Sequence, residues 1–448
     1  MKPRSILSVA LHASCALAAC DIVLTPRHQT PELAPGWQGQ LIANGFTKPR
    51  SILFDDAGGL LVLDSGVGIQ RVELNDNGGT CLSFTEIELI VDDEELNHGL
   101  ALSADGKTLY ASTVSSVYAW TYDSGAVTNR RTIIDGMSND DHTTRTLLVS
   151  RHAENHIIVS RGSDENLDTD ALDIDSGVSQ IRIFDLGSLG DEETYDFTTD
   201  GRVLGWGLRN AVGVDEDPVS GNVYSVETSV DEVTRDGADI GRNNPAEELN
   251  FHGRADESGD VGNYGYPYCY PIWDTKVPDN EDLNVGDVFS IMQNETFNDT
   301  TCQEYVPPRL VFEAHTSPLD LLFAEDGETL YISFHGSFDP DNPAGYKVGS
   351  VAFSDGQPVD RVSSTTALSD VMTNPDLGRC PDECFRPVGL AWDAEGRLWV
   401  ASDSTGEIYV LRQVEEDEEE GFVTEAGAVS VRAGVGTLVA VLVGLVLV

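Results

Sequence analysis

The most informative pattern along the chain is a pair of short apolar runs that recurs six times. In each run Leu, Val, Tyr and Ala alternate with polar residues, and an Asp-x-x-Gly turn or its equivalent separates the two runs. Alternation on both sides of a glycine or asparagine turn is typical of a β-hairpin. The copies lie at 49–74, 97–122, 144–163 (where the turn glycine is missing), 209–228, 317–337 with 345–353, and 386–412.

Six hairpin units with no helical repeat between them predict an all-β, six-bladed β-propeller. Radial repetition protects the strand edges of such units. Two β-sandwich domains are the alternative, but none of the loops resembles a linker. A propeller over 20–414 has about 65 residues per blade, against about 40 to 45 in compact propellers. The surplus predicts long loops, the longest over 162–205 and 229–316.

Both ends of the chain have the pattern of processing signals. Residues 1–19 combine two basic residues with an apolar stretch, as a secretory signal peptide does, although the ending before Cys20 also suits a lipoprotein signal. An acidic linker is expected over 415–427. The apolar tail over 428–448 is typical of a GPI-anchor signal, with a single transmembrane span as the alternative. These patterns predict a secreted protein anchored at the cell surface.

Six of the seven cysteines follow the predicted leader, and an even number in an exported chain indicates disulfides. Asn294-Glu-Thr and Asn298-Asp-Thr are acceptor sequences for N-glycosylation, which agrees with export. Cys20 could be lipidated instead of bridged. Proximity and elimination suggest the pairs Cys20–Cys81, Cys269–Cys302 and Cys380–Cys384.

The formal net charge of −49 makes nucleic acid and anionic membranes poor partners. A lipid anchor would then be the route to a membrane. Against this background, basic and amide side chains recur just before the first strand of several units, at positions that face the central channel of a propeller. Each could instead cap a strand or pair with an acidic loop, but their coincidence predicts an anionic ligand in the channel. These residues are Asn97, His98, His142, Arg145, Arg209, Asn210, His315 and Arg386.

Five motifs occur in a fixed order: NDDHTTRTLLVS, GLRNAVGVD, NPAEELNFHG with NYGYPYCYP, FHGSF with GYKVGSV, and CFRPVGLAWDAEG. Over 36–412 the chain resembles the soluble quinoprotein sugar dehydrogenases, which bind pyrroloquinoline quinone (PQQ) and calcium in a six-bladed propeller. It is most similar to the fungal secreted pyranose dehydrogenases, and then to the sorbosone dehydrogenases. The resemblance implies oxidation of the C1 hydroxyl of pyranoses, or of related 2-keto-aldoses, to lactones. Electrons would pass to an external acceptor such as a haem protein, a quinone or a copper oxidase.

The resemblance also implies roles for particular residues. His142 falls at the position of the catalytic base, and Asp141 at a sugar contact. Arg145 is expected to orient substrate or cofactor. The calcium loop corresponds to GRNNPAEE, with Arg242 and Asn243 as the nearest matches. The residues expected to hold the quinone are Asn97, Arg209, Asn210, Lys347 and Arg386.

The chemistry of these residue types agrees with those roles. A neutral histidine with an ordinary pKa of about 6.5 can remove a hydroxyl proton near neutral pH. Guanidinium groups match carboxylates in two-point contacts, and calcium takes oxygen ligands and acts as a Lewis acid. Two alternatives stay open. A calcium-dependent sugar lactonase would need carboxylates and asparagines around one central metal, and an anchored propeller could bind glycans without catalysis, since fold does not give function.

Overall fold

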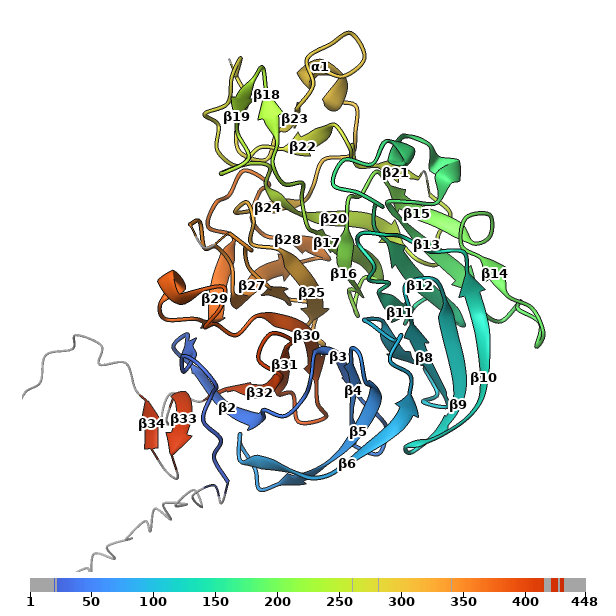
Figure 1. The fold of residues 1–448 in the computed structure, drawn as a ribbon, viewed down its shortest axis with the longest axis vertical. Coiled ribbons are helices and arrows are strands. Elements are labelled where there is room, and N and C mark those ends of the chain that lie inside the picture. The colour runs from blue at the N-terminus through green and yellow to red at the C-terminus, as the bar shows by residue number, and fades with distance from the viewer. Residues whose placement is uncertain are drawn as a thin grey trace, which may run out of the picture.

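The computed structural model describes residues 20, 22–259, 261–280, 282–339, 341–414, 420–425 and 428–430. In this part of the chain six sheets stand around a common centre (Figure 1). Each of the six repeated units forms the first hairpin of one sheet. The prediction of an all-β, six-bladed β-propeller is confirmed.

Blades I to III follow one another along the chain, and each is a meander that runs outward from the centre. Blade I comprises β3 (Pro49–Phe54), β4 (Leu60–Asp64), β5 (Gly68–Asp76) and β6 (Leu82–Asp92). Blade II comprises β7 (Leu100–Leu102), β8 (Thr108–Ser112), β9 (Val117–Asp123) and β10 (Ala126–Asp135), with β14 (Tyr195–Asp196) at its edge. Blade III comprises β11 (Leu147–Val149), β12 (His156–Arg161), β13 (Gln180–Asp185) and β15 (Arg202–Trp206), with β21 (Gly262–Asn263) at its edge.

Blades IV to VI complete the ring. Blade IV comprises β16 (Ala211–Glu216), β17 (Asn222–Glu227), β20 (Glu247–Arg254) and β24 (Leu310–Phe312). Blade V comprises β25 (Pro318–Phe323), β26 (Thr329–Phe334), β27 (Lys347–Ser354) and β29 (Leu368–Thr373), with β1 (Glu32–Leu33) at its edge and β28 (Gln357–Pro358) beside β27. Blade VI comprises β30 (Pro387–Trp392), β31 (Leu398–Ser402), β32 (Glu407–Gln413), β2 (Trp37–Ala43), β33 (Gly421–Glu425) and β34 (Ala428–Ser430).

The ring closes by pairing of distant parts of the chain. Strand β2, near the amino terminus, pairs antiparallel with β32 from Trp37 opposite Gln413 to Ala43 opposite Ile408. The innermost strands β3, β7, β11, β16, β25 and β30 contact one another in that order and back to β3. Blade VI therefore combines both ends of the propeller in one sheet.

The core consists of six apolar clusters, one between each pair of neighbouring blades. Strand β4 explains how one sequence run serves two of them. Leu60 and Val62 pack in the cluster shared with blade VI, while Leu61 and Leu63 pack in the cluster shared with blade II. Successive side chains of a strand point to opposite faces, so a strand between two blades is apolar at nearly every position.

The turn chemistry also agrees with the sequence pattern. Gly58, Gly106, Gly327 and Gly396 adopt positive φ values in the first hairpin turns of four blades, where a side chain would be strained. In the unit without a turn glycine, Asn155 adopts this conformation with φ 58°. Asparagine is one of the few other residues that enters the left-handed region readily.

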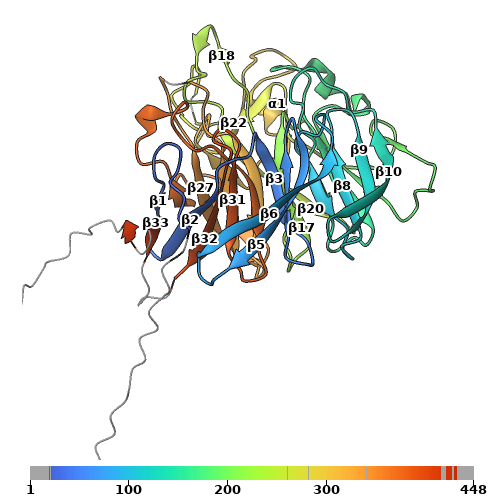
Figure 2. The ribbon, with the colours of Figure 1, turned by 60° about the horizontal axis from the view of Figure 1, so that its bottom comes forward.

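The two long insertions were expected to be loops, and this expectation is only partly right. The segment 162–205 contains the blade strands β13 and β15, and 229–316 contains β20 and β24. The remaining residues form small elements that project from one face of the ring (Figure 2). These elements are η1 (Thr169–Leu172), η2 (Ile174–Ser176), β18 (Thr234–Arg235), β19 (Ala238–Asp239), β22 (Cys269–Pro271), β23 (Val288–Ser290) and the helix α1 (Asp299–Cys302); a further turn, η3 (Leu377–Arg379), precedes blade VI.

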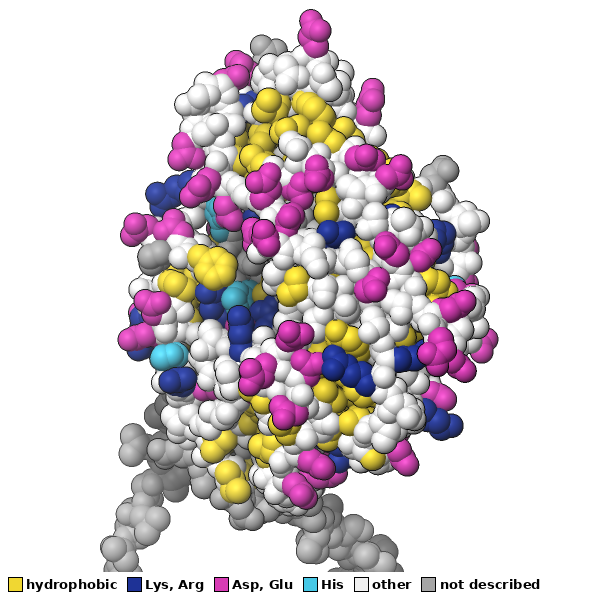
Figure 3. All heavy atoms as spheres, turned by 45° about the vertical axis from the view of Figure 1, so that its right-hand side comes forward, with side chains coloured by type: hydrophobic (Ala, Val, Ile, Leu, Met, Phe, Trp, Pro, Cys, Tyr) yellow, Lys and Arg dark blue, Asp and Glu magenta, His cyan; other side chains and the backbone are white. Residues whose placement is uncertain are grey.

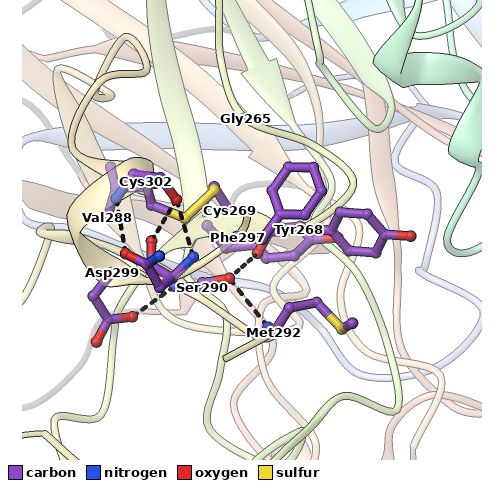
Figure 4. Close-up of a disulfide and its surroundings, with 12 residues drawn as sticks. Gly265, Tyr268, Cys269, Val288, Ser290, Met292, Phe297, Asp299 and Cys302 are labelled. Carbon is purple, nitrogen blue, oxygen red and sulfur yellow. Dashed lines mark hydrogen bonds between the residues drawn. A yellow bond between two sulfur atoms is a disulfide. The ribbon is translucent and has the colours of Figure 1, made fainter. Parts of the chain in front are cut away.

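The three predicted disulfides are present, Cys20–Cys81, Cys269–Cys302 and Cys380–Cys384. The second joins β22 to α1, and Asp299 beside it accepts the backbone N–H of Ser290 (Figure 4). This bridge reinforces the largest insertion above the ring, which also has an apolar cluster of its own that includes Val233, Tyr270 and Phe289.

Part of the predicted acidic linker belongs to a sheet, because β33 pairs in parallel with β2 and extends blade VI beyond residue 414. The predicted leader at 1–19 and the tail from 431 onward lie outside the described residues. Among the residues that are described, no helix is long and apolar enough to cross a membrane.

Candidate active site

The centre of one face of the molecule is hollowed, and Arg, Lys and His side chains gather there while Asp and Glu side chains surround the hollow (Figure 3). A cavity of about 640 Å³ lies between the loops that follow β17 and β26 and the loops that precede β20 and β25. The backbone carbonyls of Thr228 and Gly336, which line it, accept hydrogen bonds from Arg209 and Arg386. The cavity therefore adjoins Arg209 of blade IV and Arg386 of blade VI, two of the residues predicted to face the central channel.

His142 stands in the loop before β11 with a positive φ of 35° and a half-buried imidazole. Its Nδ1 lies 3.1 Å from the carbonyl oxygen of Ser163 and 2.9 Å from the Ser163 hydroxyl. The carbonyl can only accept, and the hydroxyl donates its own proton to the carbonyl of Glu165 at 2.8 Å. Nδ1 therefore carries the imidazole proton, which leaves the Nε2 lone pair free of any hydrogen bond to the described residues.

The surroundings of His142 keep its imidazole neutral. Burial, and then the charge of Arg209, lower the pKa of His142 to about 4, against the opposing influence of Asp141, the Ser163 carbonyl and Asp231. At neutral pH the ring is uncharged, which is the form that a general base requires.

Arg145 does not face the cavity. Its side chain is fully buried, and it donates to the backbone carbonyls of Met137, His142 and Thr144. Burial, followed by the charge of Arg161, lowers the pKa of Arg145 to about 9. A guanidinium is the side chain that can satisfy several loop carbonyls at once. Arg145 thus shapes the loop that carries His142 instead of contacting a ligand.

Asn97 supports the same loop from the neighbouring blade. Its Nδ2 donates to the carbonyl of Thr143 at 2.9 Å, while its Oδ1 is buried without a hydrogen-bond partner. The structure thus places Asn97 beside the loop of His142, with its Oδ1 and the second N–H of Nδ2 not engaged by the described residues.

Arg209 and Asn210 meet His142 around a single glycine. A methyl group at Gly162 would lie 2.7 Å from Asn210 Oδ1 and 2.8 Å from His142 Cβ. The Arg209 side chain is buried and donates to Asn166 Oδ1 at 2.8 Å and to the carbonyl of Thr228 at 3.2 Å. The half-buried side-chain amide of Asn210 makes no hydrogen bond within the described chain, which leaves its donors and acceptor available.

Arg386 lies on the opposite side of the hollow from the blade III residues, at the start of β30. It donates to the carbonyls of His335 at 3.0 Å and Gly336 at 2.6 Å, and its guanidinium lies 4.5 Å from the ring centre of Phe338. Burial lowers the pKa of Arg386, with Tyr346 and Asp403 acting in the opposite direction. Its Nη1 makes no hydrogen bond to the part of the chain that is described.

The structure adds three residues that sequence reasoning missed, Arg50, His335 and Asp403. Arg50 Nη1 donates to Asp403 Oδ2 at 2.6 Å, and His335 Nε2 lies 2.7 Å from Asp403 Oδ1. All three are buried, yet Nε and Nη2 of Arg50 make no hydrogen bond to the described residues. Burial is the largest influence on His335 and, against the charge of Asp403, lowers its pKa to about 4. Arg50 stands at the start of β3, the first strand of blade I. The other residues predicted to face the channel also stand at the start of a first strand, so the same rule could have predicted Arg50.

Lys347 is not brought to the cavity. It pairs with Asp370 at 2.7 Å, and it lines a small separate pocket with Trp273 and Phe334. As the first residue of β27, it belongs to the third strand of its blade and stands farther from the axis than the first-strand residues. Lys347 therefore lies outside the 640 Å³ cavity in this structure, and its role in holding the quinone stays a prediction.

The predicted calcium loop reaches the cavity, but its two named side chains are poor metal ligands. Arg242 lines the cavity with a cationic side chain, and its carbonyl accepts Nδ2 of Asn342 at 3.1 Å. Asn243 donates to Asp274 at 3.0 Å and faces a neighbouring cavity of about 400 Å³. The described residues contain no group of three or more His, Cys, Asp or Glu side chains placed to hold a metal.

The basic and amide groups beside the cavity could meet the carboxylates of a flat polyanion, although the cavity lining itself also contains carboxylates such as Asp239, Glu247 and Asp339. Two buried guanidinium groups, Arg50 and Arg386, keep unpartnered N–H groups, and Asp403 is the carboxylate ion-paired with Arg50 in the described hub. On the other side Asn210 offers a free amide next to His142. Guanidinium N–H groups and amides are the donors that recognise carboxylates most strongly.

The model of the TrAA12-like family matches residues 31–414. The chain belongs to this family. It is 50% identical over 423 residues to the pyrroloquinoline quinone-dependent sugar dehydrogenase of Hypocrea jecorina (strain QM6a), a match that covers 92% of this chain and 96% of the relative. It is 35% identical over 421 residues to the pyrroloquinoline quinone-dependent pyranose dehydrogenase of Coprinopsis cinerea, covering 90% of this chain and 57% of that relative.

Solved structures of the same group have the same fold. The calcium structure of a Trichoderma reesei carbohydrate-active enzyme of family AA12 matches with a TM-score of 0.86 and 51% identity, over 88% of this chain and 100% of that one. The holo form of the PQQ domain of the Coprinopsis cinerea pyranose dehydrogenase matches with a TM-score of 0.83 and 35% identity, over 88% and 100%. The resemblance inferred from the five motifs is confirmed.

Proposed function

We propose that the protein is a PQQ-dependent sugar dehydrogenase that oxidises the C1 hydroxyl of a pyranose, or of a related 2-keto-aldose, to the lactone. Membership in a family whose relatives are PQQ-dependent sugar and pyranose dehydrogenases supports an oxidoreductase of this class. The observation that carries the proposal is the free Nε2 of a neutral His142, with the buried guanidinium groups of Arg209 and Arg386 bonded to carbonyls of the cavity lining.

The side chains around the hollow would have two roles, to hold the quinone and to remove a proton from the sugar. Arg50 and Arg386, with Asn210 opposite, would hold the carboxylates of the quinone through N–H groups that the protein itself leaves unpaired. The chemistry that the bound quinone supplies is two-electron acceptance. His142 Nε2 would take the proton of the C1 hydroxyl, and the Ser163 oxygens on Nδ1 keep the ring in the tautomer that can do so. Asp141, exposed next to the base, is positioned to accept a sugar hydroxyl.

Calcium is the second cofactor that we propose. Gly241 and Arg242 line the cavity, and their backbone carbonyl oxygens are of the ligand type that calcium prefers. In the structure these carbonyls accept from His315 Nε2 and Asn342 Nδ2, so calcium would have to replace these two hydrogen bonds.

Removal of calcium with a chelator should abolish turnover, and calcium but not magnesium should restore it, because magnesium loses its water ligands reluctantly.

The acceptor and the location of the protein are also proposals. An external haem protein, quinone or copper oxidase would take the electrons. Secretion and a GPI anchor are proposed from the sequence patterns at 1–19 and 428–448.

The decisive experiment combines cofactor binding with turnover. Purified protein is mixed with calcium and PQQ, the absorption spectrum is titrated, and dye reduction is then followed with a series of pyranoses. His142→Ala should lower kcat by about 100-fold to 10,000-fold, the usual contribution of a general base, while the PQQ dissociation constant changes little.

His156→Ala is the matched control, since this histidine lies at the start of β12 and bonds only a nearby carbonyl. It should leave both measurements unchanged. A protein that binds PQQ and leaves every sugar unoxidised, or full turnover in His142→Ala, would refute the proposed function or the assigned base respectively.

A further inference from the structure

Asp231 is a carboxylate on the wall of the cavity for which the sequence motifs provide no role. It lies in the loop after β17, its side chain is 59% exposed, and its backbone N–H donates to Asn166 Oδ1 at 3.2 Å. Asn166 Oδ1 also accepts Nη2 of Arg209 at 2.8 Å. The Asn166 side chain thus accepts hydrogen bonds from both the backbone of Asp231 and the side chain of Arg209, the arginine near His142.

The carboxylate of Asp231 lies between two cationic partners. Its Oδ2 is 3.6 Å from Nη2 of Arg209, and its Oδ1 is 3.2 Å from Nδ1 of His315. Burial would raise the pKa of Asp231, but the hydrogen bond from His315 and the charge of Arg209 outweigh it and hold the pKa below its ordinary value. The group is therefore ionised at neutral pH.

No other carboxylate in the described structure forms an ion pair with the Arg209 side chain. Its remaining acceptors are the neutral oxygens of Asn166 and Thr228. Glu227 accepts the backbone N–H of Arg209, but burial and the neighbouring Glu248 raise the pKa of Glu227 well above its ordinary value. Asp231 is thus the negative charge that offsets this guanidinium.

The charge of Arg209 matters because it acts on His142. After burial, it is the largest influence that lowers the pKa of the imidazole. The charged groups that act on the ring are Asp141 on its own loop, Arg209 before β16 and Asp231 after β17, and the Ser163 carbonyl contacts Nδ1. A weaker base transfers a proton less readily, since the rate of general-base catalysis rises with the pKa of the base.

We propose that Asp231 is a positioning residue for the base: it holds Arg209 in place and offsets the guanidinium charge next to His142. The inference rests on the proposed function, in which His142 is the base. Asp231 acts on the base through Arg209 and through its own charge, and it does not take a proton from the sugar.

The test compares Asp231→Asn with the wild-type protein loaded with PQQ and calcium. His142 must be neutral to act, so kcat/KM falls as the pH drops through its pKa. Asp231 raises that pKa, so its loss should shift the acidic limb of the profile to lower pH by about half a unit. It should also lower kcat at neutral pH by about twofold, because the rate depends only partly on the basicity of the base. A direct readout that needs no turnover is the NMR titration of the His142 ring in the protein without cofactor, which should move in the same direction.

Two further variants separate this role from a structural one. Asp231→Glu keeps the charge and should restore most of the wild-type pH profile. Glu232→Gln removes the neighbouring exposed carboxylate, which makes no ion pair with Arg209. This variant should leave the acidic limb of the kcat/KM profile unchanged. If Asp231→Asn folds poorly, the NMR titration is made on Asp231→Ser.

The outcomes are distinguishable. The inference would be overturned if Asp231→Asn changed neither the acidic limb of the kcat/KM profile nor the NMR titration of the His142 ring. A change confined to the KM for sugar would overturn it as well. Both outcomes would leave the proposed function intact. Turnover that survives in His142→Ala would instead remove the base on which the inference depends.

Discussion

At the scale of single residues, the proposed chemistry depends on one hydrogen-bond assignment. Ser163 presents two accepting oxygens to Nδ1 of His142 because its hydroxyl proton is already donated to Glu165. The imidazole therefore has one tautomer, with the lone pair of Nε2 directed away from Ser163. The sequence could suggest His142 as a base, but it carries no sign of which nitrogen would be free.

Gly162 provides a test of how closely this group is packed. In Gly162→Ala the new methyl group would lie under 3 Å from both Asn210 Oδ1 and His142 Cβ, so one of the two must move. We expect kcat to fall by about tenfold or more, because misplacement by about 1 Å costs up to 100-fold in rate. The loss should be measured with saturating sugar and dye after cofactor loading.

Gly45→Ala is the control for that experiment. Nothing lies within 4 Å of a methyl group at this position, so activity should not change. Wild-type kcat in Gly162→Ala would mean that His142 and Asn210 do not need this arrangement.

At the scale of elements, the short helix α1 decides between two neighbouring glycosylation sequences. Asn298 is its N-cap: the side chain accepts from Thr300 and Thr301, and its Nδ2 donates to the carbonyl of Asn294. Capping by asparagine stabilises a helix by about 1 kcal/mol. Asn294 is exposed, and its Nδ2 makes no hydrogen bond within the described chain.

We therefore expect a glycan at Asn294 and little at Asn298 when the protein is exported from a eukaryotic cell. Mass spectrometry of peptides after enzymatic deglycosylation, which converts a modified Asn to Asp, would measure each site. Asn294→Gln should remove most of the glycan mass, whereas Asn298→Gln should lower stability more than glycan mass. A fully modified Asn298 in the folded protein would contradict this assignment.

At the scale of the whole molecule, stability depends on closing the ring between blades V, VI and I. Leu41 of β2 and Leu411 of β32 are fully buried in the cluster shared by blades V and VI, although about 370 residues of chain separate them. Closing so long a loop costs conformational entropy, which the apolar contacts of the shared sheet must exceed.

Leu41→Ala should lower the free energy of unfolding by about 2 to 5 kcal/mol, the usual cost of such a change in a core. Val359→Ala, at a side chain that is 62% exposed, should change it by less than about 0.5 kcal/mol. Denaturant unfolding followed by tryptophan fluorescence would compare the two. Equal midpoints for the two variants would show that the β2–β32 closure contributes little to stability.

The number and position of the blades could be predicted from the sequence, together with the place of His142, Arg209, Asn210 and Arg386 near the centre of the ring. These predictions follow from local rules, since strand alternation, glycine turns and the position just before a first strand depend on a few neighbouring residues. The three disulfide pairs were predicted from proximity and elimination among six cysteines. The sequence did not predict that Arg145 turns inward to loop carbonyls, that Lys347 pairs with Asp370, or that Arg50, His335 and Asp403 meet. Those outcomes depend on which acceptors the closed ring brings within reach, and groups from blades I, V and VI have no common signature in a linear chain.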